Sequence, residues 1–445
     1  IQYEGFENPF KEGSYRVIKA TKNKKKISSA TWDAEVPADG NYAVYVSYAT
    51  LPTSVDDAIY KVNSENGTNS FLVNQKMGGG TWVYLGHFPL KKGLNKEVVE
   101  LLNYSNNSGD ITADAVKIGG GMGNIARKVE GASEKVKSSD GSAEKKIDMP
   151  EVDYRYQLSN HPRYTEGARY FLQWAGIPDS IYSPSKGIND YTDDYKCRGT
   201  WVNYLSGGSK VLPNKKGLNI PVDLAFAFHS DAGTTMNDDI IGTLGIYYTD
   251  KFGKYADGTP RILSRDLTNK IMTNIVNDVR KQYEPNWMRR GMWDKSYYEA
   301  RVPEVPTMLL ELLSHQNFAD MKYGLDPNFR FTVSRAIYKG MLQFIAQRDG
   351  RAYVVQPLSV NSFAIRPVSD KSFMLTWLPT KDTLSANADA KKYIIYERIG
   401  DNGFKKIAVT DKTQYLAKVA DNEVHSYKVI ASNDGGLSFP SEILS

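Results

Sequence analysis

The sequence predicts a multidomain protein in which two β-sandwiches flank a central α/β domain. Residues 1–125 alternate apolar and polar side chains with period two, which is typical of strands in a sandwich. Residues 151–355 alternate helical and strand patterns, which predicts an α/β domain. Short strands separated by turns return over residues 356–445 and predict a second sandwich. A chain of 445 residues with 41% hydrophobic content can bury several such cores.

Within the first block, four apolar and aromatic runs predict strands. They lie at residues 42–48, 58–62, 81–88 and 114–118. Residues 126–150 differ from this pattern, since they are charged, small and almost free of large apolar groups. Such a segment buries too little surface to order itself, so we expect a linker between the first two domains.

The central block has helical and strand patterns in turn. Strands are predicted at the run before His229 and at residues 245–249 and 307–312, and helices at 165–176, at 267–283 and after Asp326. Asp326 can cap a helix and Pro327 costs nothing at its first position. We expect a mostly parallel sheet with helices on both faces.

Overall charge and cysteine content exclude several classes of protein. The net charge of +5 comes from 56 basic and 51 acidic residues that are interspersed, which argues against a nucleic-acid footprint. No apolar run approaches the roughly 18 residues that a transmembrane helix needs. The single Cys197 cannot form an internal disulfide. Because the sequence begins at Ile1 without a leader, we expect either a processed chain or a fragment.

Two polar residues stand at predicted strand ends in the central block. His229 follows the apolar run VDLAFAF, and Glu311 closes the strand TMLLE. The carboxyl ends of strands in open α/β folds are where binding sites form. A buried carboxylate is costly unless it is paired or functional. We therefore expect both side chains to face one cleft, although a lone histidine at such a place is also compatible with a structural role.

Four other residues are candidates for substrate binding. Arg198, Trp201 and Asn203 place a cation, an aromatic ring and an amide on one predicted helix, a mixture that suits a peptide or a sugar chain. A packed helix explains Trp201 equally well. His161 stands just before the first helix of the block, where it either lines the cleft or is a loop histidine beside Pro162.

Two domains resemble known families. The stretches YAVYVSYATLPTSVDDAIYKV, VNQKMGGGTWVYLGHF and DAVKIGGGMGNIAR resemble the golvesin-type domain, also described as xanthan-lyase carbohydrate-binding-like. Trp377, the tyrosine-rich strand after it and Tyr427 in SYKVIASNDGG resemble a fibronectin type III domain. The first resemblance implies a large secreted bacterial hydrolase, and the second implies a module that spaces or docks other domains.

The central block resembles the zinc-dependent N-acetylmuramoyl-L-alanine amidases. VDLAFAFHSDAG matches the family's strand that supplies a zinc-binding histidine, and PTMLLELLSHQNFADMKYGLDPNFRF matches the segment with its catalytic glutamate. The resemblance therefore implies that His229 is a zinc ligand and Glu311 the catalytic base. Zinc in such a site lowers the pKa of a bound water to about 7, and the glutamate takes its proton during attack on an amide carbonyl.

The sequence departs from that family in one respect. A His-Gly motif and a glutamate ligand come first in the amidases, and neither precedes His229 here. We expect these ligands outside this chain, in a separate N-terminal segment of the same precursor. The implied partner is peptidoglycan or another cell-surface glycan, met outside the cytoplasm. The alternative is a catalytically inactive or xanthan-lyase-like surface protein that binds or processes polysaccharide.

Overall fold

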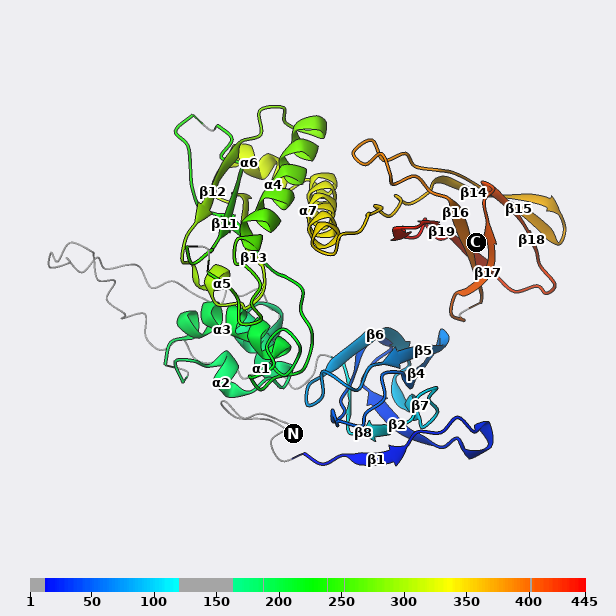
Figure 1. Ribbon diagram of the computed structural model, residues 1–445. Coiled ribbons are helices and arrows are strands. Elements are labelled where there is room, and N and C mark those ends of the chain that lie inside the picture. Colours follow the sequence, from blue (N-terminus) through cyan, green and yellow to red (C-terminus); the bar gives the residue numbers. More distant parts are fainter. Residues whose placement is uncertain (1–12, 120–162, 187, 238, 252, 401) are drawn as a thin grey trace, which may run out of the picture.

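The computed structural model describes residues 13–119 and 163–445, apart from positions 187, 238, 252 and 401 (Figure 1). The segment expected to be a linker, residues 126–150, lies outside the described residues. Among the described residues, the strands form six sheets, and every α-helix lies in the middle of the chain, between residues 168 and 348. No helix in these ranges is both long and apolar enough to cross a bilayer.

The first domain is a β-sandwich with a buried apolar core. Its strands are β1 (Arg16–Lys19), β2 (Ser29–Val36), β3 (Gly40–Val46), β4 (Ala58–Ser64), β5 (Gly67–Val73), β6 (Val83–Leu90), β7 (Gly93–Leu102), β8 (Asp110–Ala113) and β9 (Val116–Ile118), with a 3₁₀ turn η1 (Lys24–Lys26). A four-stranded sheet in the order β2-β7-β4-β5 faces a three-stranded sheet in the order β6-β3-β9, and β1 pairs with β8. Alternate residues of β3 and β4, among them Val44, Val46, Tyr60 and Val62, are buried in the core between the sheets.

Lys117 joins this sandwich to the central domain. Its side chain lies between aromatic rings, with Nζ 3.5 Å from the ring centroid of Trp174 and 4.7 Å from that of Trp82. Nζ also donates a hydrogen bond of 3.2 Å to the Trp174 carbonyl. Trp174 closes helix α1 (Ala168–Trp174). Burial lowers the pKa of the Lys117 ammonium to about 7.

This lowered pKa predicts how stability depends on pH. Between pH 7 and the ordinary lysine pKa of 10.5, the unfolded chain holds a proton on Lys117 that the folded chain has lost. The free energy of unfolding therefore rises with pH across this window. We expect thermal melts from pH 7 to 10 to show this rise for the wild type, and Lys117→Met to remove it. Lys92→Met, which changes an exposed lysine of the same domain, is the control and should keep the rise.

The central domain is built around a four-stranded sheet. Its elements are η3 (Arg163–Thr165), α1, α2 (Asp179–Tyr182), α3 (Asp190–Ser206), β10 (Ala225–Asp231), β11 (Thr243–Tyr247), α4 (Leu263–Gln282), β12 (Arg289–Asp294), α5 (Tyr298–Arg301), β13 (Thr307–Ser314), α6 (Phe318–Gly324) and α7 (Pro327–Arg348). The strand order is β10-β13-β11-β12. Helices α4 and α7 lie side by side (Figure 1). They cover one face of the sheet, where they share a core with Leu310 and Leu312 of β13.

The sheet is mixed, which qualifies the expectation of a mostly parallel one. β10 pairs with β13 and β11 with β12 in parallel, but β11 runs antiparallel to β13. A parallel return normally needs a crossover helix. The described residues between Asp231 and Thr243 contain no helix, so the chain comes back in the opposite direction.

Helix α7 begins where the sequence predicts. The Asp326 side chain accepts a hydrogen bond from the Asn328 amide, and Pro327 occupies the first helical position. Farther along, Gly340 lets α7 approach α4 closely, since a Cβ at this position would stand 2.6 Å from the Ile271 Cα. The helix pair therefore forms a tight layer under the sheet.

The last domain is a second sandwich. Its strands are β14 (Asn361–Ser369), β15 (Ser372–Leu378), β16 (Lys392–Ile399), β17 (Lys405–Thr410), β18 (Gln414–Lys418), β19 (His425–Asn433) and β20 (Gly436–Leu437). They form a three-stranded sheet, β14-β15-β18, and a four-stranded sheet, β17-β16-β19-β20. Trp377 and Tyr427, the residues that carry the fibronectin-type resemblance, are both buried in its core.

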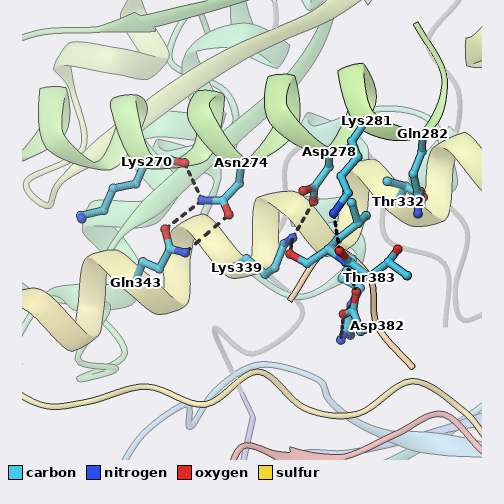
Figure 2. A network of polar contacts seen from close by, with 12 residues as sticks. Lys270, Asn274, Asp278, Lys281, Gln282, Thr332, Lys339, Gln343, Asp382 and Thr383 are labelled. Atoms are coloured by element: carbon cyan, nitrogen blue, oxygen red, sulfur yellow. Dashed lines mark hydrogen bonds and ion pairs between the residues drawn. The ribbon is translucent and has the colours of Figure 1, made fainter. Parts of the chain in front are cut away.

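Charged side chains connect this sandwich to α4 and α7 (Figure 2). Lys339 of α7 contacts Asp278 of α4 at 2.6 Å, and both side chains are buried. Lys281 donates a hydrogen bond of 2.5 Å to the Thr383 carbonyl. Arg335 pairs with the buried Asp382 at 2.8 Å. Buried charges are costly unless they are paired in this way. The contacts of Lys281 and Arg335 fix the loop around residue 382 to the helical layer.

Candidate active site

His229 and Glu311 lie beside each other on neighbouring strands. β10 and β13 pair in parallel, and His229 stands opposite Glu311 in the register. Residues that pair in this way project from the same face of a sheet. That face also carries Leu244, Ile246 and Leu309, and it is opposite to the face that α4 and α7 cover. The two residues singled out from the sequence are therefore brought together at one place.

A third residue, Glu299, completes the cluster. It belongs to the short helix α5, and its Oε2 lies 3.0 Å from Nε2 of His229. Arg198 of α3 contacts the same Glu299 oxygen at 3.3 Å and also pairs with Asp194 at 2.5 Å. Side chains of alternating charge therefore contact one another in the order Asp194, Arg198, Glu299 and His229, from α3 through α5 to β10.

The two glutamates have different surroundings. Burial raises the pKa of the Glu311 carboxyl, and the neighbouring His229 opposes this shift only in part. Glu311 Oε2 is buried and has no hydrogen-bond partner among the described residues. Glu299, in contrast, lies against both His229 and Arg198. A buried carboxyl oxygen without a partner is unusual in a folded protein and marks a position available to a ligand or a reacting proton.

Glu299 also sets the protonation of His229. Its hydrogen bond raises the pKa of the imidazole, although burial acts in the other direction. The charged imidazole is thus favoured in the folded chain, and the stability that it contributes is present below the unfolded pKa of about 6.5 and lost as the pH rises through the folded value.

Glu299→Gln should therefore lower the pKa of His229. Removing the carboxylate charge leaves burial as the main influence, which disfavours the imidazolium. The measurement is an NMR titration of the histidine ring protons. His425 provides an internal control because its own partners, Glu397 and Asp421, lie in the last domain. An unchanged His229 titration would show that the two side chains do not interact in solution.

The remaining substrate-binding candidates separate into two groups. Arg198 lies near the cluster through Glu299, as described above. Asn203 instead bridges backbone groups, donating to the Val302 carbonyl at 2.8 Å and accepting from the Glu304 amide at 2.8 Å. Trp201 packs against the core of α1 and α3. His161 lies outside the described residues.

Nearby polar residues have partners of their own. Asp231 pairs with Arg290 at 2.6 Å. His315 is exposed and contacts Ser230 at 3.1 Å. Glu299 did not stand out in the sequence, because nothing in the segment SYYEARVPE shows that a four-residue helix carries it to the end of a distant strand.

The described residues do not assemble a complete metal site. In residues 13–119 and 163–445 with their gaps, no group of three or more histidine, cysteine, aspartate or glutamate side chains is arranged to hold an ion. Zinc in proteins usually needs at least three protein ligands. His229 alone therefore cannot hold a zinc ion.

β10 lies at the edge of the sheet. Its pairings among the described residues are with β13 alone, and its apolar side chains are only partly covered. Phe228, next to His229, is 59% exposed. An apolar strand with an open edge is a template for pairing with another strand.

Comparisons with known proteins give similarities for parts of the chain. No curated protein matches it. Among solved structures, a region of 28% of the chain is similar to the N-acetylmuramoyl-L-alanine amidase AmiC2 of Nostoc punctiforme, with 16% identity, 58% of that chain covered and a TM-score of 0.22. A fibronectin-type structure titled FN3tt mut has 31% identity over 19% of this chain and 89% of its own, with a TM-score of 0.16.

The twitchin kinase region from C. elegans is similar over 20% of this chain and 16% of its own, with 21% identity and a TM-score of 0.19. These matches describe similarities of parts of the chain and give no evidence of function. A family match covers the first sandwich: residues 9–120 match the family described as the Golvesin C-terminal domain.

Proposed function

We propose that the central domain is the catalytic part of a hydrolase that cleaves an amide bond in peptidoglycan. Glu311 acts as the general base and His229 as a zinc ligand. The observation that supports this proposal best is the pairing of His229 with Glu311 on parallel strands, where one glutamate oxygen is buried without a hydrogen-bond partner.

The surroundings of Glu311 suit proton transfer. Its pKa is raised by burial, which makes the carboxylate a stronger base than an exposed glutamate. His229 is held at a fixed distance on the next strand, since the parallel pairing of β10 and β13 sets the spacing. Arg198 and Glu299, which contact each other at 3.3 Å, border the same place, and we expect them to bind polar groups of the substrate.

Zinc requires ligands beyond those described. We propose that a histidine and a glutamate from a segment of the precursor outside this sequence complete the site. The open edge of β10 and the exposed Phe228 support this proposal, because a strand added there would lie directly beside His229. When bound, zinc supplies an activated water and polarises the amide carbonyl.

The proposed setting is outside the cytoplasm, where peptidoglycan is found. The match of residues 9–120 to the Golvesin C-terminal domain supports this setting, since the golvesin-type resemblance implies a secreted hydrolase. The two sandwiches then hold the catalytic domain on its polymer.

A second candidate is a polysaccharide-binding surface protein without catalysis. It is favoured by the contact of Glu299 with Nε2 of His229, because that nitrogen is then not free for a metal.

The two candidates differ in the products they give. Protein from the complete coding region is incubated with purified peptidoglycan, and new alanine amino termini and new reducing ends are measured separately. An amidase releases amino termini without reducing ends. His229→Ala should abolish the release, whereas His315→Ala, at an exposed histidine, should not. Binding without either product would select the second candidate.

A further inference from the structure

Three tyrosines form a row beside the candidate active site. Tyr191 and Tyr195 lie on α3 and Tyr298 lies on α5. The ring centroids of Tyr191 and Tyr195 are 5.5 Å apart, and those of Tyr195 and Tyr298 are 5.8 Å apart. Tyr191 is 80% exposed, so the outer end of this tyrosine row is open to solvent.

The other end of the tyrosine row reaches the site. Tyr298 directly precedes Glu299, whose carboxylate contacts His229. On α3, Tyr191, Tyr195 and Arg198 follow one another at spacings of four and three residues, which places them on one face of the helix. Arg198 contacts Glu299 as well. The tyrosine row therefore extends from the exposed start of α3 to the cluster of Glu299 and His229.

Packing does not account for the outer end of this row. Tyr195 and Tyr298 are half-buried, and the Tyr298 hydroxyl lies 3.3 Å from Oγ1 of Thr200, but Tyr191 is exposed. The buried face of α3 contributes Cys197 to the core with α1, and Trp201 packs there too. Tyr191 belongs to no hydrophobic core cluster of the described residues, and burying an aromatic ring is what normally offsets the cost of ordering it. An exposed aromatic side chain in line with a catalytic cluster is better explained by a ligand.

We propose that the tyrosine row binds the glycan strand of the substrate, through neutral N-acetylated sugar rings. This inference rests on the proposed function and names the part of the substrate that lies along α3. The C–H faces of a sugar ring fit against aromatic π faces, which carry partial negative charge.

Charge and backbone geometry favour a sugar over other ligands. The carboxylates next to the rings on α3 are already paired, Asp190 with Tyr170 and Arg169 and Asp194 with Arg198, so this face suits a neutral ligand better than a strongly charged polymer. An extended peptide gains affinity from main-chain hydrogen bonds to a strand edge. The backbone groups inside a helix are already paired, so this face of α3 offers a peptide no such bonds.

The test is binding of a β-1,4-linked N-acetylglucosamine hexamer to the chain, measured by calorimetry. Tyr191→Ala and Tyr195→Ala should each weaken binding roughly 3- to 10-fold, as expected for the loss of one stacked ring. Tyr191→Phe and Tyr195→Phe keep the rings and should keep the affinity. Tyr15→Ala removes an exposed tyrosine of the first domain and is the matched control.

The outcomes separate this inference from the proposed function. Wild-type affinity of both alanine variants for the hexamer overturns the inference, even if the protein releases alanine amino termini. Tyrosine-dependent binding of the free stem peptide in place of the hexamer also overturns it. Tyrosine-dependent binding of the hexamer supports the inference, even if no amide is cleaved and the proposed function fails.

Discussion

Glu311→Gln should lower the rate of amide hydrolysis by about 10²- to 10⁴-fold, the contribution that a positioned general base commonly makes. Glutamine has nearly the same shape as glutamate but cannot accept the proton. The buried Oε2 has no hydrogen-bond partner among the described residues, so the substitution breaks no contact of that atom in the resting protein. We therefore expect the change in kcat with little change in thermal stability.

The pH dependence of the hydrolysis rate is a second test of the same variant. Because burial raises the pKa of Glu311, the rate of the wild type should fall as the pH drops through that raised value and the base becomes protonated. This acidic limb should be absent from the residual activity of Glu311→Gln. A variant that retains both full activity and the acidic limb would show that another group is the base.

Asp278→Ala should have the largest effect on stability, about 3–5 kcal/mol in the free energy of unfolding. The substitution leaves the ammonium of Lys339 buried between α4 and α7 without its carboxylate, while its long hydrogen bond of 3.4 Å to the Leu384 carbonyl remains. An uncompensated charge in that place is costly. Denaturant unfolding, followed by far-ultraviolet circular dichroism, measures the change.

Two further variants separate the charge effect from a general effect of mutating α4. Asp266→Ala changes an aspartate of the same helix whose ion pair with Arg265 is at the surface, and it should cost no more than about 1 kcal/mol. Replacing both buried partners, in Asp278→Leu with Lys339→Met, should restore much of the lost stability. Equal losses in the single and double variants would contradict the explanation.

Local sequence signals predicted many of the elements because their causes are local. Helix α7 begins at the Asp326 cap and Pro327, as expected from those two residues. The apolar run after Thr307 forms β13, which is buried nearly throughout, as a continuous apolar strand should be. Strand direction was harder to predict, since the antiparallel pairing of β11 with β13 depends on how the chain returns after Asp231.

The candidate site could be predicted only in part for the same reason. His229 and Glu311 each follow an apolar run, and that signal is visible along the chain. The prediction that Glu311 closes its strand is wrong, because the apolar residues Leu312 and Leu313 continue β13 as far as Ser314. Their alignment in the register, and the arrival of Glu299 from α5, depend on tertiary packing. Asn203 illustrates the opposite case: its residue type suggested binding, but in the structure it joins α3 to the backbone at residues 302–304.

The zinc affinity of His229→Ala, compared with that of the wild type, tests the account most directly. The protein is produced from its complete coding region, and bound zinc is titrated against a competing chelator. We predict one tightly bound zinc ion per wild-type chain and a loss of at least about 100-fold in affinity when the imidazole is removed. Equal zinc affinity in the two proteins, or no zinc in the wild type, would contradict it.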